Sequence, residues 1–225
     1  MGERILLTTK TGERLAAYHA PALEARRGGL VILHAIWGVT PHIRELSDTL
    51  AAQGYEVMAP SLLDGDAEFP DHNTKFEIVE TRIALGKATG WGQACVGKVQ
   101  AAIDALDGPV FGMGFCFGGS TMWAAAAVCD GLQAAVCFYG GDIVNHVDLT
   151  PKVPTLLHFG KTDETISPED VGVIADAHPG LPLYLYEAGH AFVAPGANHH
   201  EDSARLAMLR TLKHFQRSGG SKGEV

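Results

Sequence analysis

Short apolar segments alternate with longer amphipathic ones along most of the chain, and this alternation restricts the possible folds more than any other feature. Strands are expected at residues 5–9, 15–19, 30–33, 55–59, 110–113, 134–139, 155–159 and 183–187. Helices are expected at residues 41–53, 74–89, 93–106, 117–129 and 202–216, and a further one should start at Pro168 with Ser167 as its N-cap. Such alternation predicts an α/β fold, with a mostly parallel central sheet and helices on both faces.

Length and composition indicate an ordinary globular protein. With 225 residues, 46% of them apolar and 19% charged, we expect a single domain at residues 1–217 and a disordered tail at residues 218–225. The net charge of −9 argues against binding to nucleic acid or to an anionic membrane surface. No apolar run approaches the length of a membrane span, and the first residues do not resemble a signal peptide. We therefore expect a cytoplasmic monomer without nucleic-acid or membrane partners.

One of the four cysteines stands in a special setting. Cys95, Cys129 and Cys137 lie in apolar segments and are expected to be small core residues, reduced in the cytoplasm. No CxxC pair occurs, so neither a zinc ribbon nor a thioredoxin-type motif is indicated. Cys116 instead occupies the centre of Gly114-Phe-Cys-Phe-Gly118, where a predicted strand runs directly into a predicted helix.

A Gly-x-Cys-x-Gly sequence at such a junction is typical of the nucleophile elbow of α/β-hydrolases. The two glycines let strand and helix pass close together, and residue 116 then projects at the amino end of a helix, where thiolate is favoured over thiol. A dinucleotide-binding turn fits poorly, because Phe117 stands where a third glycine is needed, and a Walker A loop would need a lysine after Gly119. The remaining alternative is a core cysteine beside a tight turn.

Two further residues complete a possible triad. Asp163 follows the predicted strand at residues 155–159, and His190 follows the one at residues 183–187. All three side chains should therefore lie at the carboxyl edge of one sheet, in the order nucleophile, acid, histidine. His190 would act as general base and acid, and Asp163 would orient its imidazole.

The oxyanion hole and a competing metal site depend on the neighbouring loops. Phe117 should supply one backbone N–H, and the segment at residues 34–38, with Ile36 favoured, should supply the second. His199 and His200 raise the alternative of a metal site with His190. No further ligand occurs at suitable spacing, so we interpret them as part of a solvated loop and expect no metal and no cofactor.

Several segments together resemble the dienelactone hydrolase family of α/β-hydrolases. These segments are residues 35–39, 114–119, 138–140, 158–160 with Asp163, and 187–192. The resemblance covers nearly the whole chain. It implies that Cys116, Asp163 and His190 form the triad and that Ile36 and Phe117 provide the oxyanion hole.

Two residues of the family pattern differ in this chain. Family members that open dienelactone carry a Glu at the position of Ala35, which partners the resting cysteine, and a substrate-binding Arg at the position of Ala194. A second substrate-binding Arg of the family falls near Arg82. Trp37 and Phe192 are expected to line the pocket, together with Arg82 if that side chain reaches it.

The expected activity is hydrolysis of a small carboxylic ester or lactone through a thioacyl-enzyme, with neutral esters preferred to dienelactone. The alternatives are a non-catalytic ligand-binding protein of the same fold and a redox-sensing thiol protein.

Overall fold

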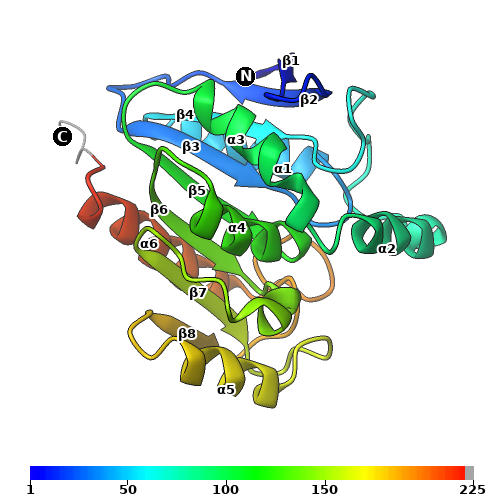
Figure 1. Cartoon of the computed structure of the whole chain (residues 1–225), viewed down its shortest axis with the longest axis vertical. Helices are drawn as coiled ribbons and strands as arrows, with labels where there is room; N and C mark the ends of the chain where they lie inside the picture. Colours follow the sequence, from blue (N-terminus) through cyan, green and yellow to red (C-terminus); the bar gives the residue numbers. More distant parts are fainter. Residues whose placement is uncertain (221–225) are drawn as a thin grey trace.

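All eight strands join one sheet in the computed structural model, which describes residues 1–220 (Figure 1). The order across it is β1-β2-β4-β3-β5-β6-β7-β8; β2 pairs antiparallel with β1 and β4, and all other pairs are parallel. The strands are β1 (Glu3–Thr8), β2 (Arg14–Ala20), β3 (Gly28–Leu33), β4 (Tyr55–Pro60), β5 (Val110–Phe115), β6 (Leu132–Phe138), β7 (Thr155–Gly160) and β8 (Leu183–Tyr186). The predicted mostly parallel sheet is confirmed.

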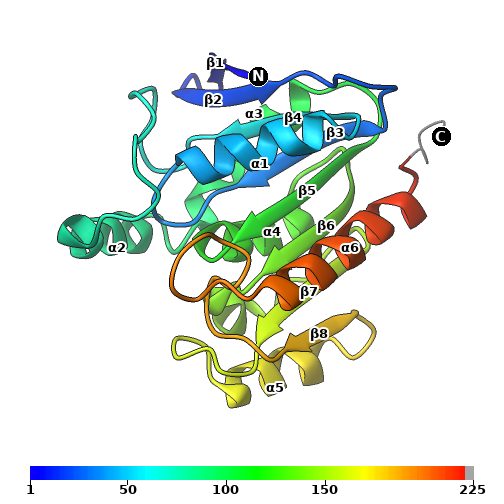
Figure 2. The same cartoon turned by 180° about the vertical axis from the view of Figure 1, so that it is seen from behind.

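Helices cover both faces of the sheet. Figure 1 shows α3 and α4 in front of the strands with α5 beside β8, whereas Figure 2 shows α1 and α6 across the opposite face. The α-helices are α1 (Pro41–Ala51), α2 (Val79–Ala88), α3 (Val96–Asp104), α4 (Phe117–Val128), α5 (Pro168–Ala177) and α6 (Glu201–Arg217). Short 3₁₀ turns occur at η1 (Phe76–Ile78), η2 (Gln93–Cys95) and η3 (Gly141–His146). The α/β class is thus confirmed, and only η3 lies outside the predicted helical segments.

The segment around α2 departs most from the sequence-based expectation. The predicted helix at residues 74–89 is divided into η1 and the shorter α2, and α2 stands at the side of the molecule in both views. No side-chain oxygen caps either start, since Lys75 and Ile78 occupy the N-cap positions. Only Arg82 and Gly86 of α2 are buried, so α2 lacks the apolar stripe that anchors a surface helix.

The other helix boundaries follow recognisable end signals. Ser167 caps α5 through a capping box with Asp170, and Pro168 is the first residue of the helix, as predicted. α1 ends shortly before Gly54, whose φ of 91° suits glycine. Past α6, Gly220 donates a backbone hydrogen bond to Phe215. The rest of the predicted tail, residues 221–225, lies outside the described residues, and the division at residue 217 stays a prediction.

The central strands bring the functional loops to one edge. Every residue of β3 and β5 is buried, as expected of strands covered on both faces. Leu33 pairs with Gly114, and Phe138 pairs with both Phe115 and His158. Because these strands are parallel, the loops after β3, β5, β6 and β7 leave the sheet at the same edge.

Candidate active site

Cys116 occupies a strained turn between β5 and α4. Its φ of 55° and ψ of −114° are unusual for a residue with a side chain. A Cβ atom on Gly114 would overlap the carbonyl oxygen of Gly118, and one on Gly118 would overlap that of Leu33. Both positions therefore require glycine, and the close approach that they permit holds the elbow together, as the Gly-x-Cys-x-Gly pattern predicts.

Cys116 differs from the other cysteines in its surroundings. It is partly exposed, whereas Cys95, Cys129 and Cys137 are buried, and all four thiols are free. Burial raises the pKa of Cys95, raises that of Cys129 to about 11, and raises that of Cys137 far above its usual value. These three thiols thus stay protonated at neutral pH and are poor nucleophiles.

Asp163 and His190 form a close pair. Nδ1 of His190 lies 2.7 Å from Oδ2 of Asp163. The other carboxylate oxygen, Oδ1, accepts from the backbone N–H of Thr165 at 2.8 Å, its hydroxyl at 2.7 Å, and the N–H of Ile166 at 3.1 Å. Burial alone would raise the pKa of Asp163, but His190 and then Thr165 hold it below its usual value. Asp163 is thus an ionised, fully hydrogen-bonded acceptor.

The imidazole of His190 connects this carboxylate to the thiol. Burial works to lower the pKa of His190, but hydrogen bonds with Asp163 and then Cys116, together with their negative charges, raise it to about 10. The raised pKa of His190 therefore favours an imidazolium beside the Asp163 carboxylate. The structure brings together all three residues that the sequence singled out.

The aromatic ring of Tyr139 packs against His190, and the sequence analysis assigned this residue no role of its own. Its ring centroid lies 5.0 Å from that of His190. Burial first, and then the charges of Cys116 and Asp163, raise the pKa of Tyr139 well above its ordinary value. Tyr139 has a φ of 39° and Ala191, beside His190, a φ of 59°, so strained backbone gathers around the triad. The match of residues 138–140 to the family, at the end of β6, is the signal that points to Tyr139.

The two predicted oxyanion donors belong to the start of α4 and to the loop after β3. Phe117 is the first residue of α4, so its N–H has no acceptor within the helix. The loop after β3 passes beside α4, because a Cβ on Gly118 would also meet the carbonyl oxygen of His34 at 2.6 Å. The ring of His34 stacks on that of Phe117, with centroids 6.5 Å apart. The loop that contains Ile36 therefore passes beside the first turn of α4, and the oxyanion role of Ile36 stays a prediction.

Comparison with known proteins identifies the family of this chain. The model of the family described as "Dienelactone hydrolase family" matches residues 15–219. The chain belongs to this family. The expected hydrolytic enzyme is thereby confirmed at the level of the family.

Individual relatives extend the match over nearly the full length. A Salmonella typhimurium protein named "Putative carboxymethylenebutenolidase" is 31% identical over 94% of this chain and 86% of its own. The carboxymethylenebutenolidase of Pseudomonas sp. strain P51 is 26% identical over 96% and 95%, respectively. Among solved structures, a dienelactone hydrolase named as putative, from Klebsiella pneumoniae, is 28% identical, covers 96% of this chain and 99% of its own, and superposes with a TM-score of 0.74.

The predicted substrate-binding residues occupy three different environments in this member of the dienelactone hydrolase family. Trp37 is partly exposed and packs edge-on against the exposed Phe76, with ring centroids 6.3 Å apart. Phe192 is completely buried and packs against Tyr139 and Tyr186, so its ring is closed to solvent. Arg82 is buried too and is engaged with protein groups.

His199 and His200 have local partners of their own. His199 lies 3.1 Å from Glu201, and His200 caps α6 by accepting from the backbone N–H of Ser203. Within residues 1–220 no group of three or more His, Cys, Asp or Glu side chains is arranged to hold a metal ion. The same part of the chain contains no helix long and apolar enough to span a bilayer.

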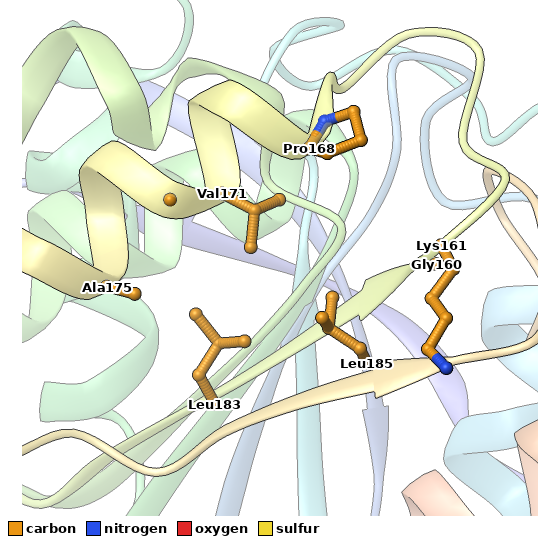
Figure 3. Close-up of a pocket in the computed structure, with 8 residues that line it drawn as sticks. Gly160, Lys161, Pro168, Val171, Ala175, Leu183 and Leu185 are labelled. Carbon is orange, nitrogen blue, oxygen red and sulfur yellow. The ribbon is translucent and has the colours of Figure 1, made fainter.

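Two surface cavities differ in their relation to the triad. The larger, about 330 Å³, is an apolar groove between α5 and β8 to which Val171, Leu183 and Leu185 contribute (Figure 3). The smaller, about 140 Å³, is lined by Trp37, Arg82 and residues of the loop before α2. No triad residue lines either cavity, but the smaller one borders the oxyanion loop and is the better candidate for substrate contact.

Proposed function

We propose that this protein hydrolyses carboxylic esters or lactones through Cys116, His190 and Asp163. The observation that carries the proposal is the hydrogen bond of 2.7 Å between His190 and Asp163 beside Cys116 on its strained elbow, where Cys116 contributes to the raised pKa of His190. Such an arrangement supplies an activated nucleophile, a proton carrier and an orienting carboxylate.

The reaction follows from these positions. The Cys116 thiolate attacks the acyl carbon, and the carbonyl oxygen gains negative charge that the N–H groups of Ile36 and Phe117 would stabilise. The carbon–oxygen bond of the ester breaks, a thioester forms, and the His190 imidazolium gives its proton to the leaving alkoxide. Water then attacks the thioester while His190 takes its proton, which releases the acid and restores thiolate and imidazolium.

We further propose a preference for neutral substrates. The guanidinium of Arg82 is paired with Asp64, and Ala194 stands where dienelactone-opening relatives carry an Arg. An unpaired carboxylate in a buried site costs several kcal/mol. Neutral acyl or aryl groups therefore suit the site better than a carboxylate-bearing lactone. All three triad residues come from one chain, so a monomer suffices.

The two alternative functions, ligand binding and redox sensing, do not explain the elbow and the triad as well as ester hydrolysis does. A ligand-binding protein needs no strained cysteine paired with a histidine, and a redox sensor usually needs a resolving thiol. Cys137 lies opposite Gly114 on the neighbouring strand, but it is buried and its pKa is strongly raised. It is therefore ill suited to resolve an oxidised Cys116.

Turnover of p-nitrophenyl acetate tests the proposal directly. Wild-type protein should turn over this ester, and intact-mass analysis of a rapidly quenched reaction should show one acetyl group, lost in Cys116→Ala. Wild-type protein without turnover, or Cys116→Ala with full turnover, would refute the proposed function.

A further inference from the structure

Arg82 joins α2 to the loop that follows β3. Its Nε donates to the carbonyl oxygen of Ile36 at 2.6 Å. Its two terminal nitrogens pair with the carboxylate of Asp64, with Nη2 at 3.0 Å from Oδ2. The side chain is only 10% exposed. A bidentate pair of this kind fixes the plane of the guanidinium, so the third donor is held on the Ile36 carbonyl.

The peptide before Ile36 is held as well. The carbonyl oxygen of Ala35 accepts from Nδ1 of His34 at 2.6 Å and from the N–H of Gly38 at 3.2 Å. Nδ1 carries the hydrogen, because Nε2 of His34 accepts from the N–H of Leu62 at 2.9 Å. Since the C=O and N–H of one trans peptide point in opposite directions, holding the Ala35 carbonyl sets the direction of the Ile36 N–H.

Both peptide planes that flank the Cα of Ile36 are therefore fixed, one through Ala35 and the other through Arg82.

Helix α2, which carries Arg82, also supports the second predicted oxyanion donor, Phe117. Gly86 lies one turn after Arg82, and a Cβ there would stand 3.0 Å from the ring of Trp91. Trp91 in turn packs edge-on against Phe117, with centroids 5.9 Å apart.

We propose that Arg82 is a positioning residue for the oxyanion hole, oriented by Asp64, and that it is not a ligand for the substrate. The inference rests on the proposed function, because it concerns the transition state of acyl transfer. Oxyanion donors contribute to the rate only when they are already aimed at the oxygen that becomes charged. Loss of the Arg82 contact frees the peptide plane that follows Ile36, so the Cα of Ile36 is held from one side only, and acylation should slow without a change in the reactivity of Cys116.

The test compares two reactions of the same cysteine in Arg82→Lys. Lysine keeps the positive charge beside Asp64 but has no fork that reaches Asp64 and Ile36 together. Hydrolysis of p-nitrophenyl acetate needs the oxyanion hole, whereas alkylation of Cys116 by iodoacetamide forms no oxyanion. We expect kcat to fall roughly 10- to 100-fold, as for other misaligned catalytic groups, with KM and the alkylation rate unchanged.

Arg44→Lys is the matched control. Arg44 also holds backbone carbonyls of this region, those of Val39 at 3.0 Å and Pro70 at 3.1 Å, but it does not contact Ile36. It should retain the wild-type kcat. If Arg82→Lys does not fold, Asp64→Asn releases the guanidinium in a chain that keeps Arg82, and should show a smaller loss of the same kind.

Each outcome decides the matter. A selective loss of kcat supports the positioning role. Wild-type kcat in Arg82→Lys, equal losses of hydrolysis and alkylation, or a defect confined to KM for a carboxylate-bearing lactone overturns it while the proposed function stands. Wild-type protein without esterase turnover overturns both.

Discussion

Thr165 donates twice to Oδ1 of Asp163, through its backbone N–H at 2.8 Å and through its hydroxyl at 2.7 Å. The same hydroxyl oxygen lies 3.0 Å from Nδ1 of His190. The carboxylate thus cannot rotate freely, and its remaining oxygen is directed at the imidazole. Asp163 therefore acts as a fixed acceptor because the turn that follows it closes back on its side chain.

Thr165→Val should slow the enzyme without unfolding it. Valine has nearly the same shape but removes a hydrogen bond to a charged group, which is worth about 1.5–3 kcal/mol. We expect kcat for p-nitrophenyl acetate to fall about tenfold. Thr162→Val, in the same loop, is the control and should keep normal kinetics. If both variants were equally slow, the loss would belong to the loop and not to the Thr165 hydroxyl.

Cys116 should be the first thiol to react with iodoacetamide at neutral pH. The other three cysteines are buried and their pKa values are raised, so they offer little thiolate. Peptide mapping during a time course should show labelling at Cys116 in parallel with loss of esterase activity. Activity that survives complete labelling of Cys116 would rule it out as nucleophile.

His190→Ala should lose at least 10²–10⁴ in kcat, the usual contribution of a general acid–base residue. His199→Ala provides the comparison, because the imidazole of His199 is paired with the neighbouring Glu201. It should retain nearly full activity. A dead His199→Ala variant beside an active His190→Ala variant would contradict the assignment of the base.

The buried His158 predicts a loss of stability in acid. Burial, aided by Arg210 and His214, lowers the pKa of His158 to about 3. Below pH 6.5 the unfolded chain takes up a proton at this residue while the folded protein does not, so the free energy of unfolding falls as the pH drops from 6.5 to about 3. At roughly 1.4 kcal/mol per pKa unit, the loss amounts to several kcal/mol.

Urea unfolding measured across this pH range checks the prediction. In His158→Phe the ring still packs against Phe138, but the titrating group is absent. Between pH 6.5 and about 3, the free energy of unfolding of the variant should fall less steeply with decreasing pH, because its unfolding takes up one proton fewer. An identical slope in both proteins would show that His158 does not contribute.

Sequence reasoning succeeded where local geometry dictates the residue type. Gly114 and Gly118 leave no room for a side chain, and the order of Cys116, Asp163 and His190 along parallel strands places them at one edge. It failed where a residue is fixed by a partner far away in the sequence, or where the local pattern is too common to indicate a role. The pairing of Arg82 with Asp64 depends on a loop without periodicity, and a threonine two residues after an aspartate is too common to signal a function.

The expected place of Phe192 and the expected start of the helix at residue 74 both differ from the structure, for related reasons. Phe192 was expected on the pocket wall because of its place near the catalytic histidine, but it is completely buried against Tyr139, which follows β6, and Tyr186 of β8. The helix expected at residues 74–89 begins only at Val79, because no capping side chain precedes it. Both outcomes depend on tertiary contacts or end signals that apolar patterning does not contain.

Substrate charge provides the final prediction, and it concerns Ala194. This residue is partly buried in the loop after His190, where its N–H donates to the carbonyl oxygen of Ala191 at 2.9 Å. Wild-type protein should show a higher kcat/KM for a neutral aryl ester than for a carboxylate-bearing lactone, because the charge of Arg82 is already paired with Asp64. Ala194→Arg adds a cation at this position and should raise kcat/KM for the anionic lactone through a lower KM. Ala197→Arg places the same charge on an exposed part of the same loop and is the control for long-range attraction, which added salt screens. Steady-state kinetics on one matched neutral and anionic pair decide the question, and a wild-type preference for the anion would mean that a cation other than Arg82 serves the pocket.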